Sequence, residues 1–379
     1  RIRDQFIDKQ FRQETNKLGY WQSRSNAIEQ LEDVMNEPSE FGLQRSLSLF
    51  WQSLQDVAAH PENGGTRAVA IDRGVAVAES FNYMNASMKE IQQNLRNEIE
   101  VSVSEVNSIL DQIASLNKQI TEVEPNGYMP NDLYDARDVL LDELSEFFPI
   151  DLEYTKSGGR ALESAEGAVT VSIRVGKESM KLVDGIERTH IQANYEKPGE
   201  EYREGLEPFQ SLSVAKMTSI VDPIARKEDG SLQEVQQTAQ YANLPSTGKF
   251  AGLIDSYGYV ENGEQKGLYP EQLDALDRLA QAFAKAFNEQ HAEGVAKNKT
   301  SSGEAASFFT TKEEPDIDTT DWKTITAENI QVSDKIQKDS SLLRASSDNS
   351  QDGEEGNGAN AKALADIQHL ILAGGANEG

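Results

Sequence analysis

Apolar side chains return every three or four positions over three long stretches in the first part of the chain. This spacing predicts amphipathic helices over about 1–36, 43–59 and 75–124. The third stretch runs for fifty residues, from Val75 to Glu124, without Gly or Pro. At 1.5 Å per residue, a helix of this length would extend roughly 75 Å. Because only helices of similar length can cover such a rod, residues 1–36 are the expected antiparallel partner.

The same spacing predicts which side chains face the helical core. In the first helix these are Ile2, Phe6, Leu18, Trp21, Ile28, Leu31 and Met35. In the third helix a near-heptad rhythm selects Met84, Met88, Ile91, Leu95, Ile99, Val103, Val106, Ile113, Leu116, Ile120 and Val123. A fourth helix is predicted over about 133–147, with Asn131 or Asp132 as its N-cap. Its inward residues would be Leu133, Val139, Leu140 and Leu144.

The period changes after Pro149, where alternation of apolar and polar side chains predicts strands. The clearest strand places Val169, Val171, Ile173 and Val175 on one face, and shorter strands fit about 150–154, 180–183, 190–193 and 210–214. Helical spacing returns at about 270–294, with a stripe of Leu273, Leu276, Leu279, Phe283 and Phe287. A hairpin is predicted over about 308–322 and a last helix over about 362–373.

These elements predict an α+β multidomain protein. Residues 1–149 and 245–379 would form a discontinuous, elongated long-helix bundle, and residues 150–244 an inserted, mainly β outer domain. In such a bundle Leu276, Phe283 and Phe287 should be buried against the first and third helices, since neither half has enough surface to cover its own stripe.

Composition narrows the functional classes. Lys and Arg number 36 against 64 Asp and Glu, which gives a net charge of −28. Nucleic acids and anionic membranes are unexpected partners because they share this negative charge. The absence of cysteine excludes disulfides and thiolate chemistry. The chain starts at Arg1, inside a predicted helix, which indicates a fragment.

No residue pattern indicates catalysis or metal binding. His60, His190, His291 and His369 each stand alone, and no P-loop, G-x-G-x-x-G or G-x-S-x-G motif occurs. A segment beginning at Asp348 resembles a calcium loop, but its twelfth position is Ala359, where a bidentate Glu is required. We interpret it as a solvated acidic loop, and the acidic run at 316–321 is a weaker pattern still. The sequence therefore predicts no catalytic, cofactor-binding or metal residues, no cofactor, and no enzyme activity.

Several strings resemble the bacterial flagellar hook-associated protein FlgK family. They cover both predicted helical segments and read RDQFIDKQFRQETNKLGYW from Arg3, NEPSEFGLQRSLSLFWQSLQDVAAHPEN from Asn36, LNKQITEVEPNG from Leu116, NDLYDARDVLLDELS from Asn131, GKFAGLIDSYGYV, LDALDRLAQAFAKAFNEQHAEG and ITAENIQVSDKI. Residues 151–244 carry no string that matches the family.

The resemblance implies a structural role: an axial component that forms the junction ring between hook and filament. It implies secretion through the flagellar type III apparatus and an extracellular location. The implied partners are copies of itself in a ring, the hook protein, the second hook-filament junction protein, and an export chaperone. The chaperone would bind a C-terminal helix of the family. Both this C-terminal helix and the N-terminal segment of the family are missing from the sequence. The alternative hypothesis is an extracellular enzyme or adhesin module, residues 150–244, displayed on an axial helical scaffold.

Overall fold

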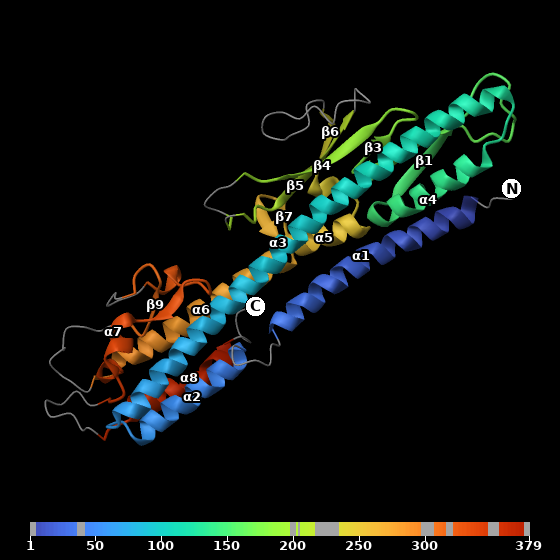
Figure 1. Cartoon of the computed structure of the whole chain (residues 1–379). Helices are drawn as coiled ribbons and strands as arrows, with labels where there is room; N and C mark the ends of the chain where they lie inside the picture. The colour runs from blue at the N-terminus through green and yellow to red at the C-terminus, as the bar shows by residue number, and fades with distance from the viewer. Residues whose placement is uncertain are drawn as a thin grey trace. The chain divides into compact units, whose positions relative to one another are not determined.

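Two compact units make up the chain, a computed structural model of which is drawn in Figure 1. The structure describes residues 5–35, 42–197, 202–203, 205–216, 235–296, 307–315, 321–347 and 356–374. The first unit comprises Arg1–Gln30 with Glu90–Pro270, and the second comprises Leu31–Lys89 with Glu271–Gly379. The helices α1 (Gln5–Met35), α3 (Gly64–Val123) and α6 (Leu268–Glu293) each contribute to both. Long helices combined with antiparallel sheets confirm the predicted α+β multidomain class.

The first unit combines helices with two sheets. Its helical elements are α1 (Gln5–Met35), the second part of α3, η1 (Glu124–Asn126), α4 (Asn131–Phe147), η2 (Tyr241–Asn243) and α5 (Lys249–Tyr257). One sheet is antiparallel in the order β1-β2-β3: β1 (Ile150–Thr155), β2 (Ala168–Val175) and β3 (Glu178–Val183). The other has the order β4-β5-β7-β8, with β6 paired to β5: β4 (Thr189–Tyr195), β5 (Phe209–Lys216), β6 (Val235–Gln240), β7 (Tyr259–Glu261) and β8 (Glu264–Lys266). All five predicted strands are confirmed.

The second unit is built around an aromatic core. Its elements are α2 (Leu43–Ala59), the first part of α3, α6 (Leu268–Glu293), β9 (Phe309–Thr311), η4 (Trp322–Thr324), β10 (Ile330–Val332), α7 (Asp334–Lys338), η5 (Ser340–Leu342) and α8 (Ala359–Gly374). The ring of Phe50 lies 5.2 Å from that of Phe287, and Phe283 lies 6.0 Å from Phe81 on α3. Helix α8 packs beside α2.

The stripe of α6 is buried as predicted except at Leu279, and Phe283 and Phe287 pack on α2 where the first helix was predicted. Leu276, Phe283 and Phe287 are all buried. Phe283 contacts Phe81 on α3, and both side chains contact the rings of α2 and Phe309 on β9 in place of the first helix. Segments from both ends of the sequence therefore share one core, which is the main feature of the discontinuous interpretation.

Helix α3 begins before Val75, the start predicted from the stretch without Gly or Pro. It has 60 residues and starts at Gly64, with Gly74 inside it. A Cβ atom at Gly74 would lie 2.8 Å from the ring of Phe308, so close packing explains a glycine that would otherwise weaken a helix. Most of the predicted stripe is buried, whereas Ile91, Leu116 and Val123 are half-buried.

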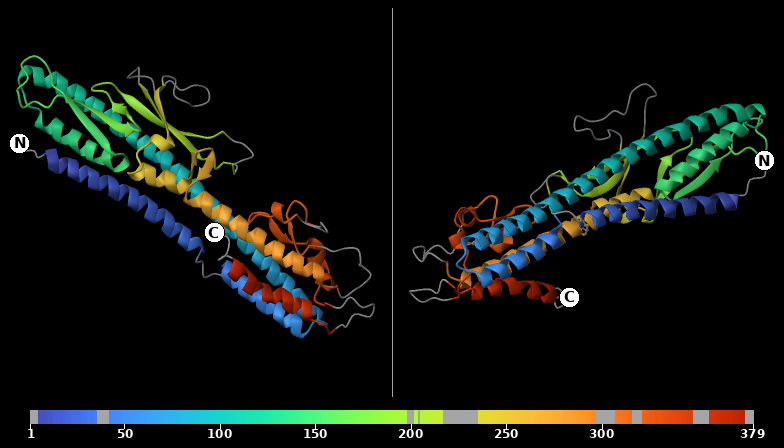
Figure 2. Two further views of the ribbon diagram at one scale, coloured as in Figure 1. Left: turned by 180° about the vertical axis from the view of Figure 1, so that it is seen from behind. Right: turned by 60° about the horizontal axis from the view of Figure 1, so that its bottom comes forward.

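Helix α1 buries the face opposite to the one predicted. Leu31 is the one buried member of its predicted stripe among the described residues. The buried face instead carries small and polar side chains, and it contacts α4 and α5 rather than α3; the two views of Figure 2 show α1 beside both helices. A Cβ at Gly19 would lie 2.7 Å from the Glu146 carbonyl oxygen, and one at Gly252 would lie 2.7 Å from that of Tyr20. Small residues were selected here because the backbones approach closely.

Helix α4 also differs from its prediction. It begins at Asn131, and the capping position is Pro130, so neither Asn131 nor Asp132 is the N-cap. Leu144 is buried as predicted, Leu133 and Leu140 are half-buried, and Val139 is exposed. Polar side chains occupy the rest of the buried face: Tyr134, Arg137, Asp138 and Ser145, beside Leu141 and Phe147. Hydrogen bonds, described below, make this polar face stable in the interior.

The hairpin predicted near the C-terminal end differs from the structure, whereas the predicted domain division is not tested by it. Strand β9 pairs with β10, so the hairpin predicted over 308–322 is wrong about its second strand. The compact units also divide the chain elsewhere than at 150 and 244, because the sheets of that region share a unit with the second part of α3. The predicted domain division stays a prediction: an inserted domain over 150–244, and a discontinuous domain formed by 1–149 and 245–379.

The α3 stripe supports a direct stability test. Ile113 is fully buried and Gln112 beside it is exposed. We expect Ile113→Ala to lower the free energy of unfolding by about 2–5 kcal/mol, because it leaves a cavity. The matched change Gln112→Ala should alter it by no more than about 0.5 kcal/mol. Denaturant melts compare the two, and equal losses would mean that the helix face is assigned wrongly.

Candidate functional site

Buried amide side chains attach both sheets of the first unit to α3. The Asn107 amide donates to the Ile191 carbonyl oxygen at 2.9 Å and accepts from the Ile191 N–H at 2.7 Å. Asn117 makes the same pair of bonds with Val169, at 2.7 and 3.1 Å. Each asparagine therefore pairs with the strand backbone much as a neighbouring strand does. These bonds fix the position of α3 along β4 and β2.

The Asn107 bonds predict a measurable loss of stability. We expect Asn107→Ala to lower the free energy of unfolding by about 2–4 kcal/mol, because it leaves the buried N–H and C=O of Ile191 without a partner. Asn97, which is exposed on the same helix, provides the matched control, and Asn97→Ala should change stability by no more than about 0.5 kcal/mol. If chemical denaturation shows similar values, the Asn107 bonds contribute little.

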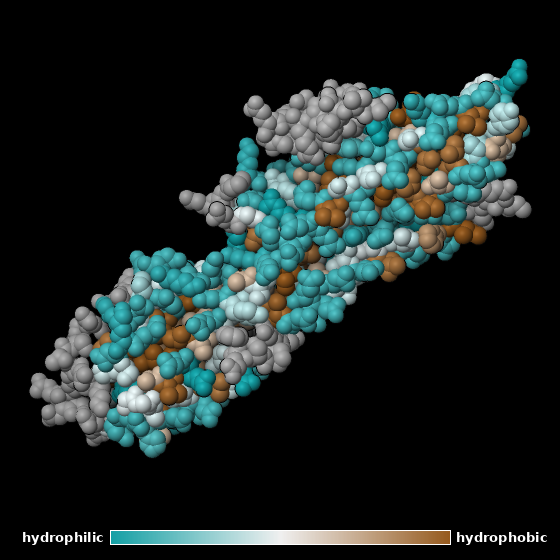
Figure 3. All heavy atoms as spheres, in the orientation of Figure 1, coloured by the Kyte–Doolittle hydropathy of each residue, from teal (hydrophilic) through white to brown (hydrophobic). Residues whose placement is uncertain are grey.

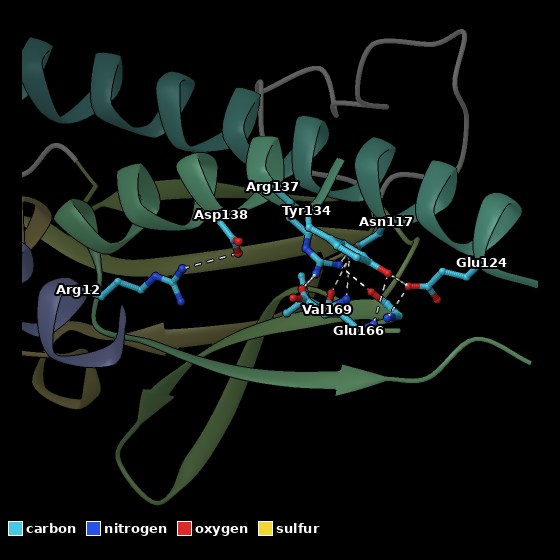
Figure 4. A network of polar contacts seen from close by, with 9 residues as sticks. Arg12, Asn117, Glu124, Tyr134, Arg137, Asp138, Glu166 and Val169 are labelled. Atoms are coloured by element: carbon cyan, nitrogen blue, oxygen red, sulfur yellow. Dashed lines mark hydrogen bonds and ion pairs between the residues drawn. The ribbon is translucent and has the colours of Figure 1, made fainter. Parts of the chain in front are cut away.

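Arg137 on α4 is the centre of a buried polar network, drawn in Figure 4. Its side chain is fully buried, and its guanidinium donates to the Gly167 carbonyl oxygen at 2.6 Å and to Glu166 Oε2 at 2.7 Å. It also lies 3.2 Å from Asn117 Oδ1. Arg137 therefore joins α4, α3 and the segment that leads into β2. Its charge is compensated by Glu166, as burial of a charge requires.

Glu124, in the turn after α3, extends this network. Its Oε1 accepts from the Tyr134 hydroxyl and from the Gly167 N–H, the latter at 2.9 Å. Burial, assisted by the hydrogen bond to Glu124, raises the pKa of Tyr134 well above its usual value. Tyr134 consequently stays a neutral donor at physiological pH. The network acts as a structural clamp, since its hydrogen bonds join α3, α4 and the segment that leads into β2.

Asp255 on α5 performs a similar task for α1. It accepts hydrogen bonds from the hydroxyls of Tyr20, at 2.8 Å, and Tyr241. Burial and the bond to Asp255 raise the pKa of Tyr20 to about 12. The hydroxyl of Tyr269 also donates to a carbonyl oxygen of α1, that of Ala27, at 3.0 Å. Helix α1 is therefore fixed along its inner face by polar contacts.

A cavity of about 420 Å³ lies beside the turn between β2 and β3. Its lining consists of Asp151, Arg174, Gly176, Lys177, Glu178 and Ser179. The Asp151–Arg174 ion pair spans 3.6 Å, and both side chains are largely exposed. Solvated pairs of this kind interact weakly and do not provide the desolvated groups that catalysis requires.

The structure places the four histidines in different surroundings. His60 and His369 are exposed, His190 Nε2 lies 3.2 Å from Asp111, and His291 is buried, where its Nε2 accepts the Arg344 N–H. Across the described residues, no group of three or more His, Cys, Asp or Glu is arranged to hold a metal ion. The acidic segments at 348–355 and 316–320 lie outside the described residues. No helix in the described part of the chain has the length and apolar character needed to span a membrane.

Comparison with known proteins identifies the family. The family described as "Flagellar hook-associated protein FlgK helical domain" matches residues 28–309. The chain belongs to the FlgK family. Flagellar hook-associated protein 1 of Bacillus subtilis is 40% identical over 320 residues, covering 83% of this chain and 58% of the relative. Its namesake in Salmonella typhimurium is 24% identical over 293 residues, covering 77% of this chain and 45% of the relative.

A solved FlgK structure agrees with the fold. It is described as the flagellar hook junction protein FlgK from Burkholderia pseudomallei, and it matches with a TM-score of 0.54 at 19% identity. The match covers 80% of this chain and 46% of the solved one. The chain thus spans about half the length of the relatives it matches.

The polar residues that join the sheets and helices of the first unit were not predicted from the sequence. Asn107 and Asn117 directly follow Val106 and Leu116 of the predicted stripe, and Arg137 lies on a helix whose face was assigned from its leucines. A usable signal existed at the asparagines, because an amide on an inward helix face implies a buried hydrogen-bond partner. Their strand partners lie 84 and 52 residues away, which no local pattern reveals.

Proposed function

We propose that this chain is a structural axial component of the bacterial flagellum, which forms the junction ring between hook and filament by subunit packing. It performs no catalysis. The observation that carries the proposal is the 40% identity to a flagellar hook-associated protein over 83% of the chain. The similar fold of the Burkholderia protein, which is described as a hook junction protein, supports the same role.

The architecture of the units suits such a role. The asparagine bonds of α3 and the Arg137 network tie the sheets of the first unit to its helices. A component that transmits torque needs fixed shape more than it needs a binding cavity. The polar interior contacts supply that fixed shape because their geometry is directional.

The proposed partners follow from membership of an axial assembly. They are copies of this chain in a ring, the hook protein and the second hook-filament junction protein. We propose an extracellular location, reached through the flagellar type III apparatus. An export chaperone would bind a C-terminal helix outside these 379 residues. The names of the relatives do not favour the alternative of an enzyme or adhesin module at 150–244, and the Asp151–Arg174 ion pair in the cavity of that segment is solvated.

A chimeric protein tests the proposal. In Bacillus subtilis cells that lack their own hook-associated protein 1, the matched span of that protein is replaced by this chain. We expect filaments attached to hooks and restored swimming, seen by electron microscopy and motility assays. Hooks that remain bare although the chimera is secreted and folded would contradict the proposed role. A chimera carrying Asn107→Ala serves as a destabilised control and should attach fewer filaments.

A further inference from the structure

Asparagine is followed by glycine at four places in the chain, and such pairs can modify themselves. The pairs are Asn63–Gly64, Asn126–Gly127, Asn262–Gly263 and Asn357–Gly358. The backbone nitrogen of the second residue can attack the side-chain Cγ of the asparagine, and glycine hinders this attack least because it has no Cβ atom. In a folded protein the reaction also requires that the asparagine amide and the glycine N–H are not held by other groups.

Two of these pairs are held by a hydrogen bond within a turn. The side chain of Asn63 accepts the Gly65 N–H at 2.8 Å, and that of Asn357 accepts the Ala359 N–H at 3.0 Å. Each bond fixes the side-chain amide in one orientation. Attack by the glycine nitrogen would first have to break this bond, so both amides are protected.

The Asn126–Gly127 pair is held at both reacting groups. Its side-chain amide donates to the Glu122 carbonyl oxygen at 2.9 Å, and the Gly127 N–H donates to the Glu124 carbonyl oxygen, also at 2.9 Å. Asn126 is nevertheless exposed, and Gly127 has a positive φ of 85°. This pair is therefore a matched control for an exposed Asn-Gly turn whose reacting groups are not held.

The Asn262–Gly263 pair is such a turn, and it joins β7 to β8. Asn262 is exposed with a φ of 55°, and Gly263 has a φ of 83°, as in the two-residue turn that favours Asn-Gly. Within the described part of the chain, no hydrogen bond engages the Asn262 side chain or the Gly263 N–H. A Cβ atom at Gly263 would meet no atom within 4 Å, so there is room for a ring to close. Figure 3 shows hydrophilic side chains at the surface near β7.

The hairpin around this turn is short and closes on two like charges. Strands β7 and β8 have three residues each, and Glu261 faces Glu264 directly across the turn. Like charges in this position weaken a strand pair, although Lys266 lies 2.9 Å from Glu264 and offsets part of the repulsion. Local opening of the turn is therefore easy, and it gives Asn262 the backbone rotation that ring closure requires.

We propose that Asn262 is a site of spontaneous deamidation. The Gly263 nitrogen forms a bond to Cγ of Asn262 and gives up its proton, while the bond from Cγ to Nδ2 breaks and Nδ2 leaves as ammonia. The resulting five-membered imide then takes up one water molecule at either of its carbonyl carbons. The products are an aspartyl residue and an isoaspartyl residue, whose main chain runs through Cβ and Cγ.

Both products change the hairpin. Each adds a carboxylate to the turn that separates Glu261 from Glu264, where like charges already face each other. The isoaspartyl product also lengthens the main chain by one atom, so the turn no longer fits the register of β7 and β8. The site does not rest on the proposed function, so either can fail without the other.

Ageing of the whole chain tests the proposal. The 379-residue protein is kept folded in mildly alkaline buffer, and the peptides that contain the four pairs are then compared by mass spectrometry. Replacement of the amide by a carboxylate changes the mass, and an isoaspartyl methyltransferase with labelled S-adenosylmethionine reports the isoaspartyl product. We expect Asn262 to react at least about fivefold faster than Asn126, because two hydrogen bonds must first break at Asn126, each a factor of about two to ten.

Two variants and the unfolded chain make the test specific. Asn262→Gly keeps the turn, because glycine accepts a positive φ, and it should remove most of the isoaspartyl signal. The matched variant Asn126→Gly should leave that signal nearly unchanged. In denaturant the difference between Asn262 and Asn126 should largely disappear, since the folded structure protects one of them. Hydrogen exchange in β8 should become faster in the aged chain and stay unchanged in aged Asn262→Gly.

Two results would overturn the proposal. If Asn262 reacts no faster than Asn126 in the folded chain, the turn itself protects the amide. If the peptide with Asn262 keeps its mass while Asn63 or Asn357 is converted, the hydrogen bonds of those two side chains do not decide which pair reacts.

Discussion

Arg137→Ala is expected to lower the free energy of unfolding by about 3–5 kcal/mol, because removing one partner of a buried charge pair leaves the other uncompensated. In this case Glu166 would lose its cation and the Gly167 carbonyl oxygen its donor, at sites 2.7 and 2.6 Å from the guanidinium. Guanidinium chloride melts followed by far-UV circular dichroism measure the change. The affected transition should be that of the first unit.

Arg174 provides the control for Arg137. It also pairs with a carboxylate, Asp151, but its side chain is 78% exposed and the two charges lie 3.6 Å apart. Arg174→Ala should therefore change stability by no more than about 1 kcal/mol. Similar losses for the two arginines would show that the Arg137 network contributes no more than a surface ion pair.

Phe287→Ala is expected to destabilise the second unit by about 3–5 kcal/mol, because it empties the centre of the aromatic core. The Phe287 ring lies 4.8 Å from that of Phe308, 5.2 Å from Phe50 and 5.3 Å from Phe309, so one truncation removes contacts with α2 and with the segment that holds β9. Thermal melts and denaturant melts both report the loss.

Leu279 provides the control on the same helix. It was predicted to share the stripe of α6, yet it is 38% exposed. Leu279→Ala should cost no more than about 1–2 kcal/mol, since more than a third of Leu279 is already exposed and its removal leaves no enclosed cavity. If Leu279→Ala proved as damaging as Phe287→Ala, the packing of α6 would have to be reassigned.

The extent of regular structure could be predicted wherever the local pattern was unambiguous. The bounds of α2 agree with the prediction, and the alternation of β2 fits a strand whose apolar face is buried. Helix α5 and strands β6, β7 and β8 were not predicted; the two latter strands are only three residues long, too short to show a period. The partner of β9 could not be predicted, because β10 follows after an intervening segment and pairing depends on the folded path.

The candidate site shows the same division. The long rod of α3 and the absence of catalytic motifs were predictable from spacing and residue type. The clamp of Asn117, Arg137 and Glu166 was not, because each side chain is ordinary alone and acquires its role from partners in other elements. Whether a polar side chain can be buried depends on where its hydrogen-bond partners lie, and those positions are set only by the folded structure.

From its sequence alone, the protein could be assigned its family, its α+β class, the helical and strand periods, and the apolar stripe along α1. The tertiary structure decided which side of α1 and of α4 is buried. Periodicity groups side chains onto one face, but it does not state whether that face contacts its own chain. On α1, close backbone approach at Gly19 and Gly252 turned a small, polar face inward and left Leu18 and Trp21 outside. Burial depends on the shape and hydrogen bonds of distant partners, whereas the pattern depends only on neighbours in sequence.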